Sequence, residues 1–271
     1  MPPKKNDESR TRVEKIAKKK RELMDLAIKH KNSKKNVGDA VGVRVSGTLS
    51  RVVGKTPKLP VSGSEEQFTN LVWGSPEGIV GNNCYGYALG VYRDGGYRKL
   101  QPGELAGTTS DKDDLTQCAT LKKRTLEDLA TQKNGGYLSK PGVACTSGYY
   151  KIMSFVAPKK DYHFYRQTGD MLVHINENNT VNSIAKNAGV PVKNVNIPPG
   201  ENFKNRMVLL QDAGLWTHKR GLDELTTKDA SGKFIKDPRK ANRDYGALNY
   251  TTYCDSFCIP TREEGKVSKS R

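Results

Sequence analysis

Residues 82–90 read Asn-Asn-Cys-Tyr-Gly-Tyr-Ala-Leu-Gly. An asparagine at 82 or 83 can cap a helix that begins near Cys84, and the glycines from Gly90 onward can end it. A thiol in the first turn gains from the positive end of the helix dipole, which lowers its pKa and favours the nucleophilic thiolate. The run therefore predicts a short helix with a candidate nucleophile at its start.

Two strand-like runs carry histidines. Residues 161–167 read Asp-Tyr-His-Phe-Tyr-Arg-Gln and follow a turn-like segment, so they predict the second strand of a hairpin. Residues 215–219 read Leu-Trp-Thr-His-Lys. Side chains alternate along a strand, so His163 shares a face with Tyr165, and His218 shares a face with Trp216. A thiol-bearing helix packed on an antiparallel sheet that bears the imidazoles is an α+β architecture.

Cys84 and His163 are the candidate catalytic pair. An imidazole brought beside the thiol by the fold would complete a Cys–His pair, and His218 is a candidate orienting group. The alternative is structural, because a free cysteine is most often a small buried hydrophobe. Five cysteines and four histidines in 271 residues also allow chance pairings.

The positive charge is concentrated at the N-terminus. Residues 1–60 hold 17 Lys and Arg against 6 Asp and Glu, whereas the remaining residues hold 29 against 23. Such an arm attracts a polyanion through counterion release, and nucleic acid is the commonest one. An anionic membrane surface or an acidic protein is the alternative partner. The candidate nucleic-acid contacts are Lys4, Lys5, Lys18, Lys19, Lys20, Arg21, Lys34 and Lys35.

Composition limits the compartment and the cofactors. The five cysteines are odd in number and irregularly spaced, the N-terminus has no apolar signal region, and no apolar run approaches a membrane span. We therefore expect synthesis in a reducing, intracellular compartment, with a virion as one destination. Neither a phosphate loop nor a dinucleotide fingerprint is present, and Cys254 and Cys258 lack zinc spacing, so no cofactor or metal is expected.

The expected organisation has three parts. Residues 1–66 form a basic arm and linker, 67–261 an α+β body, and 262–271 a basic tail. Within the body, about 170–212 read as an insertion, in which Thr180 caps a short helix that ends at Gly189. This insertion resembles the helical part of a LysM glycan-binding module and equally the first turn of a helix-turn-helix. A plain structural insertion is the third interpretation.

Several motifs together resemble a poorly characterised family from bacteria, phages and large viruses. The resemblance spans about residues 80–260 and leaves the N-terminal arm outside. Its motifs are Asn83-Cys-Tyr-Gly-Tyr-Ala88, Pro102-Gly103, the run 161–167, Gly214-Leu-Trp-Thr-His-Lys-Arg-Gly221, Asp229-Ala-Ser-Gly232, Asp237-Pro-Arg239 and Phe257-Cys-Ile-Pro260.

The order of these motifs is similar to papain-like peptidases and to the cell-wall amidases of that superfamily. This similarity implies a papain-like body, with Cys84 as nucleophile, His163 as general base and then acid, and His218 orienting the imidazole. Backbone N–H groups at the helix start, with Asn82 or Asn83, would stabilise an oxyanion. The insertion departs from the family pattern, in which the two histidine strands nearly adjoin.

Two functions of different classes follow. The first is a papain-like cysteine hydrolase that acts on an amide bond in a peptide or peptidoglycan. The second is a non-enzymatic structural protein, such as a minor capsid or internal virion component, whose basic arm binds genome or neighbouring subunits. An open cleft at the thiol favours the first, and a buried thiol facing leucines favours the second.

Overall fold

The computed structural model describes residues 58–68, 72–93, 99–132, 135–175, 180–196 and 206–261. The basic arm, with its eight candidate nucleic-acid contacts, and the basic tail lie outside the described residues. Within the described residues, no helix is long and apolar enough to cross a membrane.

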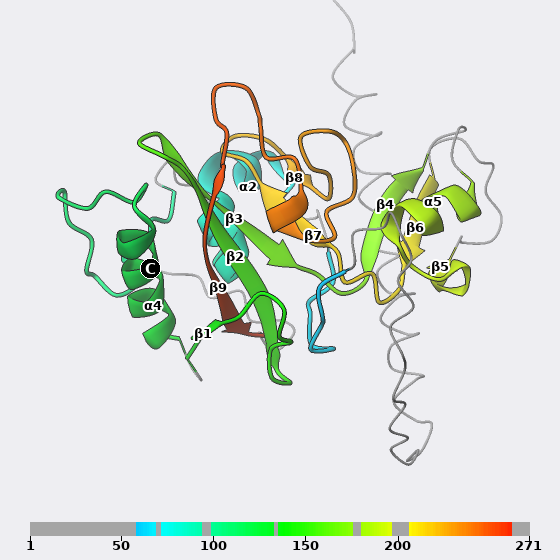
Figure 1. Cartoon of the computed structure of the whole chain (residues 1–271), viewed down its shortest axis with the longest axis horizontal. Coiled ribbons are helices and arrows are strands. Elements are labelled where there is room, and N and C mark those ends of the chain that lie inside the picture. The colour runs from blue at the N-terminus through cyan, green and yellow to red at the C-terminus, as the bar shows by residue number, and fades with distance from the viewer. Residues whose placement is uncertain are drawn as a thin grey trace, which may run out of the picture. The chain divides into compact units, whose positions relative to one another are not determined.

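The body is built on an antiparallel sheet of six strands in the order β1-β9-β2-β3-β7-β8 (Figure 1). Its combination with short helices confirms the predicted α+β class. The strands are β1 (Tyr137–Ser139), β2 (Tyr149–Ala157), β3 (Asp161–Gln167), β7 (Trp216–Lys219), β8 (Leu225–Thr226) and β9 (Thr252–Pro260).

The predicted cysteine helix is present as α3 (Cys84–Leu89), which follows the short helix α2 (Pro76–Gly81). The Asn83 side chain caps α3 by accepting a hydrogen bond from the backbone N–H of Gly86. Gly90 ends it in the left-handed conformation, with φ of 66°, which glycine adopts without steric cost. A longer helix, α4 (Cys118–Ala130), packs beside β9 (Figure 1).

The two faces of the sheet carry different side chains. On β3, Tyr162 and Phe164 pack with Cys84 and with leucines from α3 and α4. The alternate residues His163 and Tyr165 lie on the other face, which is rich in tyrosine, as the strand periodicity predicts. The predicted hairpin of β2 and β3 is confirmed.

The insertion forms a small sheet of its own, in the order β4-β6-β5. Thr180 and Ser183 form a capping box at the start of its helix, which ends at Gly189 as predicted. A three-residue helix and a strand follow, so the described residues lack the second helix that a helix-turn-helix requires. The LysM-like interpretation stays a prediction. The elements are β4 (Met171–Ile175), α5 (Val181–Ala188), η1 (Val192–Asn194), β5 (Val195–Asn196) and β6 (Arg206–Leu210).

Four of the five cysteines form disulfides, which corrects the expectation drawn from their spacing. Cys118 pairs with Cys254, and Cys145 pairs with Cys258, which leaves Cys84 as the free thiol. The pairing depends on tertiary contacts of β9 with α4 and with the loop before β2, and these contacts leave no signature in sequence spacing. Disulfides persist in oxidising surroundings, so they argue against the reducing compartment that we expected.

The segment 58–66, expected to be linker, contacts the body. Lys58 Nζ donates to the carbonyl oxygen of Ala213 at 2.8 Å, and Ser62 Oγ donates to that of Tyr149 at 2.6 Å. Glu66 forms an ion pair with the buried Arg166 of β3. The body therefore begins before residue 67, because these hydrogen bonds and this ion pair anchor the segment to it.

Candidate active site

Two histidines that are 55 residues apart in the chain meet in the protein interior. His163 Nε2 of β3 lies 2.9 Å from His218 Nδ1 of β7, and both rings are buried. Backbone pairing of Arg166 with Thr217 aligns the two strands and so fixes this approach. The structure thus brings together two of the predicted site residues.

A backbone carbonyl fixes which ring nitrogens carry protons. His218 Nε2 lies 3.0 Å from the carbonyl oxygen of Lys228, and a carbonyl only accepts. In the neutral ring, Nε2 of His218 therefore donates and Nδ1 accepts. His163 Nε2 must then donate to it, which leaves Nδ1 of His163 with a free lone pair. Nδ1 is therefore the ring nitrogen of His163 that can accept a proton.

Both imidazoles are neutral near pH 7. Burial lowers the pKa of His163 well below its usual 6.5, and repulsion from a protonated His218 and from Arg220 lowers it further. Burial also lowers the pKa of His218 to about 4, although its hydrogen bond to the Lys228 carbonyl opposes the shift. These lowered pKa values keep both rings neutral, as the assigned tautomers of His163 and His218 require.

Aromatic rings enclose the histidine pair. The Tyr165 ring centroid lies 4.9 Å from that of His163 and 4.7 Å from that of His218. The ring centroid of Tyr250 lies 4.9 Å from that of His163. The Tyr250 hydroxyl donates a hydrogen bond to the carboxylate of Asp161. This apolar shell excludes water, which accounts for the lowered pKa of both imidazoles.

The Cys84 thiol lies against the backbone on either side of His163. Its sulfur is 4.0 Å from the carbonyl oxygen of Tyr162, and the N–H of Phe164 also reaches it. The residue is 6% exposed, and burial raises the pKa of the thiol to about 12. No hydrogen bond joins this thiol to an imidazole among the described residues. The structure therefore places the thiol at the histidine segment but in its protonated, covered form.

The side chains of Asn82 and Asn83, predicted to help an oxyanion, are engaged elsewhere. Asn83 Nδ2 donates to the carbonyl of Leu100 while its oxygen caps α3. The amide of Asn82 bonds to both the N–H and the carbonyl of Arg93. The backbone N–H of Tyr85 at the start of α3 does reach the Cys84 sulfur, so it is the donor left to stabilise an oxyanion there.

Sequence reasoning missed three residues around the histidines. Lys228 acts through its backbone carbonyl, which no side-chain pattern reveals. Tyr245 places its hydroxyl 3.4 Å from His218 Nε2. Lys219 is fully buried next to His218 in the chain, and a lysine inside a strand-like run was the one signal that could have drawn attention to it.

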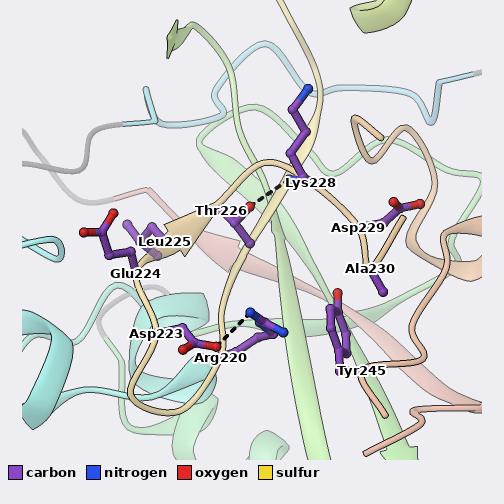
Figure 2. A pocket seen from close by; sticks show the side chains of 9 residues that line it. All are labelled: Arg220, Asp223, Glu224, Leu225, Thr226, Lys228, Asp229, Ala230 and Tyr245. Atoms are coloured by element: carbon purple, nitrogen blue, oxygen red, sulfur yellow. Dashed lines mark hydrogen bonds and ion pairs between the residues drawn. The ribbon is translucent and has the colours of Figure 1, made fainter. Parts of the chain in front are cut away.

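A pocket of about 450 Å3 is lined by residues between Arg220 and Ala230 and by Tyr245 (Figure 2). Arg220 forms an ion pair with Asp223 there and stacks over the ring of Tyr245. Lys228 and Tyr245 line the pocket and also contact His218 Nε2. Among the described residues, no group of three His, Cys, Asp or Glu side chains could hold a metal ion.

Comparison of the chain with protein-family models, with curated proteins and with solved structures returned no match.

Proposed function

We propose that this protein is a papain-like cysteine hydrolase that cleaves an amide bond, with Cys84, His163 and His218 as its catalytic group. The observation that supports it best is the 2.9 Å approach of His163 Nε2 to His218 Nδ1. That contact leaves Nδ1 of His163 unprotonated, on a strand whose backbone touches the one free thiol among the five cysteines.

The proposed reaction has two halves. Cys84 packs on the face of β3 opposite the His163 ring, so the reaction requires a shift of α3 against β3 that brings Nδ1 of His163 to the sulfur. His163 Nδ1 then takes the proton from the Cys84 thiol as the sulfur attacks the carbonyl carbon, and the carbonyl π electrons move to its oxygen. The C–N bond then breaks, and the imidazolium gives its proton to the leaving amine. In the second half His163 takes a proton from water, whose oxygen attacks the thioester and releases the carboxylic acid and the thiol.

His218 and the Lys228 carbonyl act as positioning groups in this mechanism. The imidazolium that forms on His163 donates from Nε2 to His218 Nδ1, while the carbonyl keeps His218 in the accepting tautomer. The rings of Tyr165 and Tyr250 pack against the His163 ring and help to hold its orientation. A fixed tautomer of the base is a requirement of triad catalysis.

The test is hydrolysis of a mixed library of peptide and amide substrates by the wild-type protein and by the Cys84→Ala and His163→Ala variants. We expect turnover with the wild type, none with Cys84→Ala, and a loss of about 100-fold or more with His163→Ala. Turnover that survives Cys84→Ala in a folded protein would exclude the proposal. Trapping of an acyl group on Cys84 would support it directly.

A second candidate is a non-enzymatic structural protein, and the covered thiol favours it. Cys84 is 6% exposed and packs with Leu89 and Leu100, and burial raises its pKa to about 12. If the wild type and Cys84→Ala bind partners and assemble identically, and neither hydrolyses the library, the structural function is the better account.

A further inference from the structure

Lys219 is a buried cation without a carboxylate. It is the last residue of β7, and its Nζ donates to the carbonyl oxygens of Ile79 at 2.8 Å and Gly221 at 2.7 Å. No Asp or Glu among the described residues forms an ion pair with it. A buried charge is costly unless it is paired, so this ammonium calls for a counter-charge.

Strand alternation directs Lys219 toward the thiol-bearing helix. His218 faces the tyrosines, so its neighbours Thr217 and Lys219 face the other side of β7. Two contacts agree with this: Thr217 Oγ1 lies 2.6 Å from the hydroxyl of Tyr87 in α3, and Lys219 binds the carbonyl of Ile79 in α2.

Strand register then places Lys219 at the level of Cys84. Arg166 of β3 lies opposite Thr217 of β7. Continued by two residues, this register sets Phe164 opposite Lys219. The backbone N–H of Phe164 is the one that reaches the Cys84 sulfur. The thiol and the ammonium therefore both lie at the level of Phe164 of β3, two residues beyond the last backbone pair of β3 with β7.

We propose that Lys219 is a positioning residue for Cys84, and that its ammonium stabilises the thiolate when the thiol loses its proton. The inference builds on the proposed hydrolase, in which that thiolate attacks the substrate. Nevertheless, it concerns the ionisation of Cys84 and can be tested without any substrate.

The charges around the thiol support this role. After burial, which dominates, the negative charge of Asp161 also raises the thiol pKa, whereas the Phe164 and Tyr85 N–H groups and the Lys219 charge lower it. The hydroxyls of Tyr162 and Tyr250 also interact with a thiolate, but as acids they would add negative charge. Lys219 is thus the side-chain cation that favours thiolate over thiol.

The coupling is reciprocal. The pKa of Lys219 is lowered to about 8, mainly by burial and also by the positive charge of Lys99. The negative charges of an ionised Cys84 and of Asp223 raise this pKa. Since each ionised group stabilises the other, removal of the ammonium must raise the pKa of the thiol.

Lys151 of β2 is a matched control within the same chain. It is equally buried, its Nζ donates to the carbonyls of Lys140 and Val143, and burial lowers its pKa to about 8. The charges that act on it are those of Arg239 and Glu65, not that of Cys84. It reproduces the burial and the carbonyl contacts of Lys219 without the thiol.

The experiment is the rate of Cys84 alkylation by iodoacetamide without reductant, followed by mass spectrometry between about pH 6 and 7, below the Lys219 pKa of about 8, where its amine is largely protonated. The variants are Lys219→Gln, Lys219→Met and Lys151→Gln, each first checked for a cooperative thermal transition. Glutamine keeps N–H donors for the Ile79 and Gly221 carbonyls and removes only the charge.

We expect Lys219→Gln and Lys219→Met to slow alkylation about tenfold at each pH, and Lys151→Gln to match the wild type. A purely structural role predicts that Lys219→Gln matches the wild type, and that result would overturn the inference. Equal slowing by Lys151→Gln would also overturn it. If both neutral variants fail to fold, Lys219→Arg decides: a tenfold loss with the charge retained excludes the electrostatic role.

This outcome is separate from that of the proposed function. Slower alkylation in Lys219→Gln, together with substrate turnover that survives Cys84→Ala, would retain the lysine–thiol pair and exclude the hydrolase.

Discussion

The two ends of the six-stranded sheet are held together by different means. At the β1–β9–β2 end, disulfides tie β9 to α4 and to the loop before β2. At the β3–β7–β8 end, the helix that carries the free thiol is joined to β7 by a hydrogen bond between Tyr87 and Thr217. Covalent cross-links are thus confined to the end away from the histidines, and the end with the histidines keeps its cysteine as a free thiol.

The largest expected effect concerns the cross-linked end. Each disulfide spans more than 100 residues, with sequence separations of 136 and 113. Loop-closure entropy then predicts a loss of about 4–5 kcal/mol in the free energy of unfolding for replacement of either cysteine pair by alanine. Urea titration measures this loss. Cys84→Ala is the control, because it replaces a cysteine without removing a cross-link. A variant that lacks both disulfides and is as stable as the wild type would show that the cross-links do not stabilise this end.

The next effect concerns the histidine end and depends on pH. The folded pKa of His218 is about 4, below the unfolded value of about 6.5, so between these values the unfolded chain binds the proton more tightly. Stability is therefore complete above about pH 6.5 and falls as the pH drops toward 4, by about 3 kcal/mol for this group alone.

Thermal or urea unfolding across this pH range checks the slope. His218→Asn, which cannot titrate, is expected to flatten it, while the disulfide variants keep the wild-type slope at lower stability. A slope unaffected by His218→Asn would mean that the acid sensitivity has its origin elsewhere in the chain.

A smaller effect separates orientation from packing at His218. Asparagine can place its Oδ1 near the position of His218 Nδ1 and still accept from His163 Nε2, whereas alanine cannot. We expect His218→Ala to slow turnover about 10- to 100-fold, mainly through kcat, and His218→Asn to retain most of it. Equal loss in both variants at equal melting temperature would leave His218 without an orienting role.

The smallest effect compares two tyrosines of the same helix. Tyr85 donates to Asp128 of α4, toward the cross-linked end, and Tyr87 bonds to Thr217 of β7. Replacement of either by phenylalanine should cost about 1–2 kcal/mol of stability. Only Tyr87→Phe is expected to change the Cys84 alkylation rate, because of the two tyrosine hydroxyls only that of Tyr87 bonds to β7, the strand of Lys219. A larger rate change in Tyr85→Phe would reverse this assignment.

The sequence predicted the elements whose signals are local. The Asn83 cap and Gly90 end of α3, the alternation that places His163 beside Tyr165, and the Thr180 capping box each arise from neighbouring residues. The sequence allowed a contact between His163 and His218 but did not predict it, because the residues of the two strands do not specify that β3 pairs with β7.

What could not be predicted depends on long-range contacts. Cysteine spacing gave no indication that Cys254 and Cys258 would meet partners more than 100 residues away. The tautomer of His218 is set by a backbone carbonyl, which every residue possesses. Burial of Lys219 and of Lys151 departs from the usual exposure of lysine, and it depends on backbone carbonyls that the fold brings to each ammonium.

The insertion enters and leaves the body at one place. Met171, its first strand residue, lies opposite Leu210, its last, and the carboxylate of Asp170 accepts a hydrogen bond from the N–H of Asp212. Just outside the insertion, the backbone N–H of Thr168 donates to the carbonyl of Leu215 at 2.9 Å. The chain therefore leaves β3 and returns to β7 between neighbouring residues, so the two histidine strands pair as they would in a hairpin. The insertion is nevertheless tied to the body, because its apolar side chains share one core with Phe68, Tyr87 and Leu225.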